Sequence, residues 1–399
     1  MSLGLSLSTR LLLGWSLAGA IWCTAQVSTK MSSNATTVKP KITNDLVFQQ
    51  LSPRRVHRHH CCVEKSSETF RKVSKVLGRY TAIKPSSLRR TQEQLAAQIP
   101  PSLEGPILVV GLAEAAIGLS QGIHEIYSQS TQREDVLYSH TTRYLIEGLE
   151  SVSFDEEHSH APKHYLYWPQ EPSVREIVSH VRTLIVIDDE STTRKTFFNI
   201  VGELENQLPE LKTAVHLVIH DWAEPSYPQK NNNLKFDFHS LTSGQWRFEP
   251  VKANHRNYHP TRNAIGNGLD KSEYLNLSFG RTPLHTLPAR NPEIKPIANG
   301  KILVLGTGEF QYLPFRWAEK LEAEGHDVSF QSTTRSPLLA GVGIESILEF
   351  EDGYGDGISN YLYNTHPDQF DQVFLCCESK SHVLPPQLLD YPNLEPVYF

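Results

Sequence analysis

The chain has 399 residues, a formal net charge of −6 and 39% apolar residues. A chain of this length is expected to form roughly two domains with buried cores. Its slightly acidic balance argues against a general nucleic-acid binder, which would present a basic field. The same balance does not exclude a small phosphorylated ligand, because a local group of backbone N–H donors binds a phosphate on its own.

Two features of the sequence bear on its compartment. The five cysteines are odd in number and include two adjacent pairs, which makes a poor disulfide framework and is typical of a reducing compartment. Against this, the apolar residues 11–23 follow Arg10 and resemble a signal peptide, although they are too few for a comfortable membrane span. We expect residues 1–50 to be a leader or disordered extension. We also expect a cytoplasmic protein without membrane contact, with export as the alternative if residues 11–23 are a working signal.

The chain from residue 51 to 222 alternates apolar runs with helical patterns. Short apolar runs bounded by turn residues predict buried strands, and the longer segments between them predict helices. The expected strands are 107–110, 136–138, 165–167, 183–187 and 214–219, and the expected helices are 114–128, 172–178 and 196–207. Such alternation implies a mostly parallel sheet with right-handed crossovers, so residues 51–222 are expected to form one α/β domain.

The last part of the chain predicts a second α/β unit. Residues 223–299 carry Pro, Asn and His without apolar periodicity, and we expect a linker with local structure around Trp246. Residues 300–399 show the alternation again and are expected to form a second domain. Its expected strands are 302–305, 328–331 and 373–377, with a helix near 317–324.

A segment of acids and hydroxyls, residues 188–196, follows the predicted strand 183–187. A buried parallel strand delivers the next loop to the carboxyl edge of the sheet, where ligands bind, and the N–H groups of the following helix attract a phosphate. The hydroxyls suit phosphate oxygens, whereas the carboxylates of Asp188 and Asp189 suit sugar hydroxyls or a hydrated Mg²⁺. The pattern favours a phosphorylated ribose as ligand. The alternative is a helix N-cap with surface charge.

This segment resembles the loop by which type I phosphoribosyltransferases bind the ribose 5-phosphate part of phosphoribosyl pyrophosphate. The resemblance implies that Asp188 and Asp189 are catalytic, contacting the ribose hydroxyls and Mg²⁺. It also implies that the following residues bind phosphoribosyl pyrophosphate: Glu190, Ser191, Thr192, Thr193, Arg194, Lys195 and Thr196. The chain departs from the family at Arg194, where glycine is usual. Glycine permits positive φ and close approach of the backbone, so the departure bears on catalysis more than on the fold.

An earlier segment extends the resemblance. Residues 110–119 resemble the first-strand loop that receives pyrophosphate in this family. The resemblance implies a pyrophosphate-binding role for Gly111, Leu112, Ala113 and Glu114. Charge builds up on the pyrophosphate as it leaves the oxocarbenium-like ribose, so Mg²⁺ and backbone donors of this loop are expected to stabilise it.

Two polar stretches, residues 139–143 and 154–161, stand where the mobile catalytic loop of the family would lie. We expect this loop to close over the substrates and exclude water. We hypothesise that Arg143 or Lys163 adds positive charge near the pyrophosphate. The acids and histidines of residues 155–160, together with His164, are also a candidate metal site, for which a solvated loop is the simpler interpretation.

The chain is similar to one subgroup of the family, encoded in bacterial Ter (tellurite-resistance) stress-response clusters. The C-terminal domain of that subgroup is named TRSP after a motif that stands here at residues 334–337, and residues 73–80 resemble the start of the subgroup. The resemblance implies a type I phosphoribosyltransferase fold, with a mostly parallel sheet flanked by helices. It also implies a second, TRSP domain of the α/β class over residues 300–399.

Polar loops of this second domain are candidate ligand sites. The predicted strand 302–305 ends in a glycine-rich turn like that of a dinucleotide-binding loop, but Gln311 occupies the position of the third glycine. We therefore expect this turn to bind a phosphate group rather than NAD. Arg335 offers a planar fork for an anion, with a structural turn as the alternative. Residues 352–357 predict a turn or a sugar-binding loop. The candidates are Gly306, Thr307, Gly308, Glu309, Thr334, Arg335, Ser336, Asp352 and Asp356.

These features predict a Mg²⁺-dependent enzyme that transfers ribose 5-phosphate from phosphoribosyl pyrophosphate to a nitrogenous base and releases pyrophosphate. Members of the Ter subgroup are often called orotate phosphoribosyltransferase-like, and the implied product is a nucleoside-like metabolite of the stress response, but nothing in the sequence identifies the base. The alternative, favoured by Arg194, is a non-catalytic sensor of a phosphoribosyl ligand whose second domain contacts partners. We expect no nucleic-acid partner and leave a homodimer open.

Overall fold

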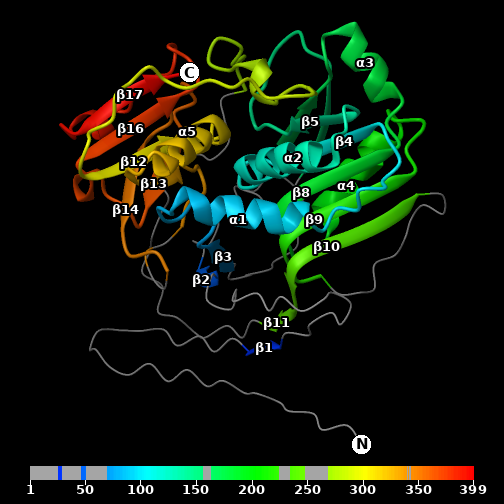
Figure 1. The fold of residues 1–399 in the computed structure, drawn as a ribbon, viewed down its shortest axis with the longest axis horizontal. Helices are drawn as coiled ribbons and strands as arrows, with labels where there is room; N and C mark the ends of the chain where they lie inside the picture. Colours follow the sequence, from blue (N-terminus) through cyan, green and yellow to red (C-terminus); the bar gives the residue numbers. More distant parts are fainter. Residues whose placement is uncertain are drawn as a thin grey trace, which may run out of the picture.

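The computed structural model describes residues 26–28, 46–50, 70–155, 163–223, 234–247, 268–338, 340 and 343–399. The leader-like residues 11–23 and most of the predicted mobile loop, residues 156–162, lie outside this range. Two parallel sheets, each with helices packed against it, form the body of the molecule (Figure 1). This confirms the predicted α/β class and a second C-terminal domain with its own parallel sheet.

The first sheet has five strands in the order β10-β9-β8-β4-β5, and all neighbouring pairs are parallel. Four of its strands confirm predicted apolar runs: β4 (Ile107–Gly111), β5 (Val136–His140), β8 (Thr183–Ser191) and β9 (Thr213–Asp221). Alternate side chains enter two different core clusters, with Ile185 and Ile187 in one and Leu184 and Val186 in the other. Both faces of the sheet are therefore buried, as is usual for parallel sheets.

The fifth strand, β10 (Lys235–Ser243), was not predicted. It lies within residues 223–299, where we expected a linker with local structure. It pairs with β9 from Lys235 opposite Thr213 to Ser243 opposite Asp221. Because β10 is the edge strand, its side chains are mostly half-buried, and it lacks the continuous apolar run that identifies the central strands.

Helices cover both faces of this sheet. The helices α1 (Pro85–Ala96) and α2 (Ile117–Thr131) pack on one face, and α3 (Pro172–Ser179) and α4 (Lys195–Glu205) on the other. The last three confirm predicted helices with ends that differ by a few residues, whereas α1 was not predicted. Between β5 and α3 the chain forms the antiparallel hairpin of β6 (Ser151–Asp155) and β7 (Lys163–Tyr167).

The second sheet has four parallel strands in the order β13-β12-β16-β17. The strands β12 (Lys301–Gly306), β13 (Asp327–Ser332) and β16 (Gln372–Cys377) confirm predictions, and β17 (Leu394–Tyr398) is additional. Helix α5 (Tyr312–Ala323) connects β12 to β13, and α6 (Pro386–Leu389) connects β16 to β17. An antiparallel pair, β14 (Ile347–Glu351) and β15 (Ser359–Tyr363), lies between β13 and β16 in sequence.

Three helices join the two domains. Figure 1 shows α1, α2 and α5 between the two sheets, and Leu119 of α2 shares a core cluster with Leu313 of α5 and Val304 of β12. Arg89 of α1 also makes a two-pronged contact with Glu319 of α5, with N–O distances of 2.6 and 2.9 Å. The domains therefore share a continuous apolar core.

Shorter pairings complete the described structure. β1 (Gln26–Ser28) pairs with β11 (Gln245–Arg247), which is the local structure around Trp246, and β2 (Leu46–Gln50) pairs with β3 (Phe70–Ser74). Single 3₁₀ turns occur at η1 (Leu277–Phe279) and η2 (Pro367–Gln369). Within the ranges given above, no helix is both long enough and apolar enough to span a bilayer.

Candidate active site

Two candidate loops meet at the carboxyl edge of the first sheet. Their strands β4 and β8 are parallel neighbours, with Gly111 opposite Ile187. The first residue after β4, Leu112, donates its N–H to the carbonyl of Ile187 at 3.0 Å. The segment predicted to receive pyrophosphate therefore begins directly beside the segment predicted to hold the ribose phosphate.

The acidic part of the second segment is strand rather than loop. β8 continues through Ser191, with Asp188 opposite Val218 and Ser191 opposite Asp221. We expected the loop to begin at Asp188, and this was wrong because β9 runs equally far and supplies backbone partners. The three consecutive acids 188–190 are half-buried at the end of this strand.

The turn into α4 is short, and its hydroxyls reach solvent. It comprises residues 192–194, since α4 begins at Lys195. Thr192, Thr193 and Lys195 are exposed and Thr196 is half-buried, whereas Ser191 is buried. Unpaired N–H groups and the positive end of the helix dipole belong to the first turn of any α-helix. This turn therefore combines exposed hydroxyls with a helix N-terminus, as phosphate binding requires.

Arg194 adopts a left-handed backbone conformation, which glycine adopts more readily than other residues. Its φ of 58° lies in the left-handed region. Its Nη2 donates to Asp221 Oδ2 at 2.5 Å, and the guanidinium carbon lies 3.9 Å from the centroid of the Phe238 ring. The arginine charge is therefore engaged by β9 and β10, and the ion pair and cation–π contact offset the cost of a left-handed non-glycine residue.

Contacts with Ser120 and Thr141 restrict the loop after β4. A Cβ atom at Gly111 would lie 2.0 Å from Ser120 Oγ, so glycine is needed there. The peptide between Ala113 and Glu114 is cis, and Ala113 donates its N–H to Thr141 Oγ1 at 2.8 Å. The N–H groups of Leu112 and Ala113 already have protein acceptors. We expected both residues to supply donors to pyrophosphate, and this contact pattern argues against it.

Arg143 lies beside this loop, as hypothesised. Its Nη2 donates to the carbonyl of Ala113 at 3.1 Å. The same residue donates its backbone N–H to Glu309 Oε1 at 2.7 Å, and Thr142 Oγ1 donates to Glu309 Oε2 at 2.5 Å. Lys163, the other hypothesised cation, lies at the start of β7 with its ammonium 5.2 Å from the centroid of the Tyr165 ring. The geometry therefore favours Arg143 over Lys163.

His164 contacts two residues inside the protein. Its Nδ1 lies 2.9 Å from Thr141 Oγ1, and its ring stacks on Phe154 with centroids 4.7 Å apart. The remaining members of that predicted metal site, at residues 156–160, fall outside the described residues. Where the chain is described, no three His, Cys, Asp or Glu side chains are grouped to hold a metal ion.

Glu309 of the second domain is part of a buried charge network. Arg281 pairs with Glu309 at 3.3 Å and also with Glu378, and all three side chains are almost wholly buried. Burial, the largest single influence, would raise the pKa of Glu309, but Arg281, His140, Arg335 and the hydrogen bond from Thr142 together outweigh it and lower the pKa. At Glu378 burial prevails and raises the pKa. The sequence analysis missed Arg281 and Glu378 because neither belongs to a motif.

A second network joins the two stretches that suggested the Ter subgroup. Arg79 donates to Thr334 Oγ1 from Nη2 at 2.8 Å and from Nε at 3.1 Å, and its Nη2 also lies 3.4 Å from Glu114 Oε2. Arg335 Nε lies 4.0 Å from the same carboxylate oxygen, and its guanidinium lies 4.7 Å from the Tyr144 ring centroid. The side chain of Glu114, the last residue of the predicted pyrophosphate loop, is buried against the second domain.

The two acids predicted as ligands in residues 352–357 shape a turn. Asp352 accepts backbone N–H groups from Tyr354, Asp356 and Ile358 at 3.0, 3.2 and 3.0 Å. Asp356 Oδ1 lies 2.7 Å from the ammonium of Lys271, and both side chains are buried. The turn interpretation is therefore favoured over a sugar-binding loop. Of the remaining candidates, Gly306 is the last residue of β12, Thr307 and Gly308 follow it, and Ser336 donates its N–H to Thr334 Oγ1 at 3.2 Å.

Comparison with protein families identifies both domains. A family described as Phosphoribosyl transferase (PRTase_2) matches residues 66–245, and one described as TRSP domain C terminus to PRTase_2 matches residues 281–389. Fold and site thus define a phosphoribosyltransferase-type protein with an additional domain. The chain therefore carries a PRTase_2 phosphoribosyl transferase domain followed by a C-terminal TRSP domain.

Solved structures with detectable similarity cover only part of the chain. A hypothetical protein from Neisseria gonorrhoeae with bound ppGpp is 11% identical, with a TM-score of 0.25, over 42% of this chain and 86% of its own. Adenine phosphoribosyl transferase from Trypanosoma brucei, in complex with AMP, pyrophosphate and ribose-5-phosphate, is 11% identical, with a TM-score of 0.27, over 39% and 65%. A hypoxanthine phosphoribosyltransferase from Staphylococcus aureus is 10% identical, with a TM-score of 0.25, over 41% and 77%. Comparison with curated protein sequences finds no match.

Proposed function

We propose that this protein is a Mg²⁺-dependent phosphoribosyltransferase that joins a nitrogenous base to the ribose 5-phosphate of phosphoribosyl pyrophosphate. The bond from ribose C1 to pyrophosphate oxygen breaks, the bond from C1 to a base nitrogen forms, and the proton of that nitrogen passes to solvent. One observation carries the proposal. The segments 188–196 and 111–114 emerge side by side from the adjacent parallel strands β8 and β4. A ligand with a phosphate at one end and a pyrophosphate at the other needs two such loops.

The phosphate end of the ligand would lie on the turn before α4. Thr192 and Thr193 are exposed there, and the helix begins immediately afterwards at Lys195. Exposed hydroxyls and helix N–H groups bind a phosphate without a bulky cation in the cradle. This fits the orientation of Arg194, whose guanidinium pairs with Asp221 rather than facing the turn.

The carboxylates of Asp188 and Asp189 fit a partly hydrated Mg²⁺ bound together with substrate. Both residues are half-buried at the end of β8, so a ligand can reach them. Mg²⁺ commonly keeps several waters and takes one or two carboxylates plus phosphate oxygens, so a complete cage of protein ligands is not required. When bound, the metal would neutralise charge on the pyrophosphate.

The leaving pyrophosphate would be stabilised from the loop after β4. The guanidinium of Arg143 is anchored there by the carbonyl of Ala113 at 3.1 Å. Arginine stays charged at any physiological pH, and a fixed charge aimed at a developing anion lowers the barrier without reorganisation. Arg143 thus takes over part of the task that we had given to the N–H groups of Leu112 and Ala113.

We place the reaction in the synthesis of a nucleoside-like metabolite of the stress response, following the resemblance to the Ter subgroup. Because phosphoribosyl pyrophosphate is a cytosolic metabolite, we place the protein in the cytoplasm. The competing idea of a non-catalytic sensor rested on Arg194. Its left-handed backbone is one that glycine also adopts, and its side chain is engaged by Asp221 and Phe238, so this support for a sensor is weakened.

The test is pyrophosphate release. The purified protein is mixed with phosphoribosyl pyrophosphate, Mg²⁺ and each member of a panel of purine and pyrimidine bases. Release that depends on both a base and Mg²⁺ is the expected result. Binding of phosphoribosyl pyrophosphate without release across the whole panel would favour the sensor, and absence of binding would contradict both functions.

A further inference from the structure

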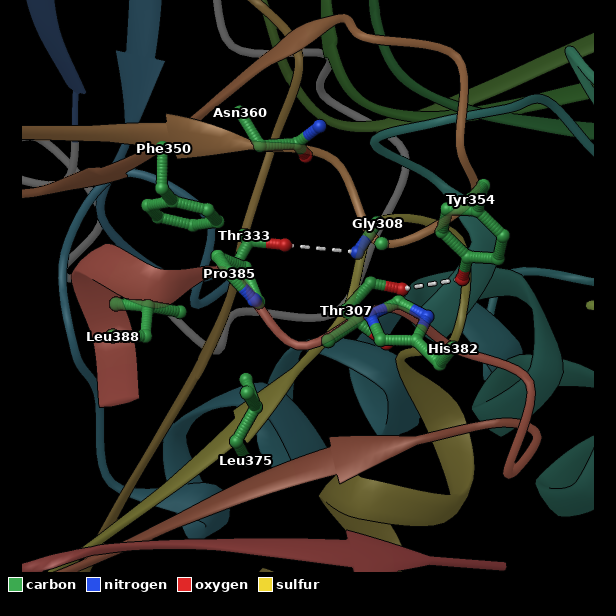
Figure 2. Close-up of a pocket in the computed structure, with 11 residues that line it drawn as sticks. Thr307, Gly308, Thr333, Phe350, Tyr354, Asn360, Leu375, His382, Pro385 and Leu388 are labelled. Carbon is green, nitrogen blue, oxygen red and sulfur yellow. Dashed lines mark hydrogen bonds between the residues drawn. The ribbon is translucent and has the colours of Figure 1, made fainter. Parts of the chain in front are cut away.

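The loop that follows β12 in the second domain is fixed by hydrogen bonds on several sides. Thr307 donates from Oγ1 to a backbone carbonyl of β16 at 3.0 Å. Gly308 donates its N–H to Thr333 Oγ1 at 3.0 Å, and the carbonyl of Thr307 accepts from the Tyr354 hydroxyl at 3.2 Å (Figure 2). The next residue, Glu309, therefore extends from a loop that three neighbouring segments of its own domain hold in place.

From this loop, Glu309 binds two consecutive residues of the first domain. One carboxylate oxygen accepts the backbone N–H of Arg143 at 2.7 Å, and the other accepts the hydroxyl of Thr142 at 2.5 Å. The second oxygen also lies 3.3 Å from Arg281 Nη2. Burial raises the pKa of Glu309, but Arg281 and its other neighbours lower it further, so the carboxylate is ionised at pH 7 and both oxygens are acceptors.

Arg143 is thereby held at both of its ends. Glu309 fixes its backbone, and its Nη2 donates to the carbonyl of Ala113, in the loop after β4, at 3.1 Å. A charged group at a binding site is effective only when it is held within about 0.5 Å of its working position. A displacement of about 1 Å costs up to about 100-fold in rate. The position of the Arg143 guanidinium therefore depends on a carboxylate of the second domain.

The chain offers a test of whether Glu309 merely stabilises the fold. Glu378 pairs with the same Arg281 and is buried to the same extent as Glu309. Its other printed partner is the backbone N–H of Asn276, at 2.5 Å, rather than Thr142 or Arg143. A purely structural role would be common to both carboxylates, whereas a role in positioning Arg143 would belong to Glu309.

We propose that Glu309 of the TRSP domain is a positioning residue of the first site, which holds Arg143 against the loop after β4 and so strengthens the binding of pyrophosphate there. The second domain then forms part of the phosphoribosyltransferase site. The inference rests on the proposed function, because it takes pyrophosphate as the ligand of Arg143.

The experiment is calorimetric titration of the full chain with inorganic pyrophosphate in the presence of Mg²⁺. Glu309→Gln keeps the length of the side chain but removes its charge and one of its two acceptor oxygens. We expect pyrophosphate affinity to fall by roughly ten-fold, the equivalent of one lost hydrogen bond. Glu378→Gln is the matched control and should leave the affinity unchanged, although urea unfolding should show that both variants are less stable.

A double-mutant cycle tests whether Glu309 acts through Arg143. Groups that act through one another give losses that do not add. Glu309→Gln should therefore weaken pyrophosphate binding by less than about two-fold when it is introduced into Arg143→Ala. If Glu309→Gln does not fold, Thr142→Val takes its place in the cycle. It removes one of the two donors to Glu309 and should weaken binding by about two-fold or more in the otherwise unaltered protein.

Equal pyrophosphate affinity in the unaltered protein and the Glu309→Gln variant would overturn the inference. So would an equal fall in Glu378→Gln, additive losses in the cycle, or an unaltered protein that does not bind pyrophosphate. The proposed function fails by a different result, which is the absence of pyrophosphate release with every base. If pyrophosphate still binds in that case and Glu309→Gln weakens it, the positioning role of Glu309 stands without the reaction.

Discussion

The two parallel sheets of this protein end differently at their carboxyl edges. At the first edge, Thr192 and Thr193 are exposed and the neighbouring acids are half-buried, so a large charged ligand has access. At the carboxyl edge of the second sheet, the polar residues of the loops are buried, and Glu309 accepts a hydrogen bond from the first domain. The same topology thus provides one carboxyl edge that is open to solvent and one that is closed by contact between the domains. The difference lies in the loops, since the strands are alike.

The largest loss of stability should come from removing the contact that Glu309 makes between the carboxyl edges of the two sheets. Glu309→Ala leaves Arg281 with one carboxylate instead of two, and removes the acceptor of Thr142 Oγ1 and of the Arg143 N–H. We expect a loss of about 3–5 kcal/mol in unfolding free energy, as for other broken buried ion pairs. Urea unfolding measures it.

Glu319→Ala is the matched control, because Glu319 also joins the domains but is 25% exposed in its ion pair with Arg89. Its loss is expected to be about 1 kcal/mol or less. Equal losses for the two variants would mean that the buried contact is no stronger a link than the surface one.

The next largest effect should be on catalysis, at the carboxyl edge of the first sheet. Asp188→Asn combined with Asp189→Asn keeps the side-chain size but removes the charge that attracts Mg²⁺. Pyrophosphate release should fall by about 100-fold or more, within the range seen when one stabilising group of an active site is removed. The unfolding midpoint should stay close to that of the unaltered protein, because both residues are only half-buried. Unchanged release would remove these carboxylates from the mechanism.

A smaller effect should separate the backbone of Arg194 from its side chain. Arg194→Ala loses the contacts to Asp221 and Phe238 while keeping a left-handed residue with a Cβ, whereas Arg194→Gly loses the same contacts and relieves the backbone. We expect the alanine variant to be less stable than the glycine variant by about 1 kcal/mol. Both should retain pyrophosphate release. Loss of release in the glycine variant would assign the guanidinium a direct role at the turn.

A further expected effect is a pH dependence of stability in the first domain. Burial lowers the pKa of His216 to about 3, whereas a histidine in the unfolded chain titrates near 6.5. The unfolded chain therefore binds this proton more readily. Its contribution to stability is complete above about pH 6.5 and falls by about 1.4 kcal/mol per pH unit as the pH drops towards the folded pKa.

His216→Phe removes this titrating group and keeps a ring that can stack on Phe197, from which the histidine ring lies 4.6 Å away. Urea unfolding at pH 7.0 and 5.5 should show a smaller loss of stability on acidification in this variant. An identical loss in both proteins would show that His216 is not protonated on unfolding in this range.

Local sequence predicted the central strands well. A parallel strand that is buried on both faces is expected to be a continuous apolar run. Such runs stand at residues 107–110, 183–187, 214–219 and 302–305. The same reasoning placed residues 188–196 at a carboxyl edge, where they lie. It failed at β10, because an edge strand is half-solvated and its sequence carries no such run.

By itself, then, the sequence determined the strands, the helices that follow them and the order of the candidate loops, because these depend on neighbouring residues. Only the tertiary structure decided which loops share a site. Glu309 holds Arg143 from 166 positions away, and Arg79 reaches Thr334 across 255. Tertiary packing determines which side chains this far apart along the chain become partners, and a local sequence pattern contains no information about it.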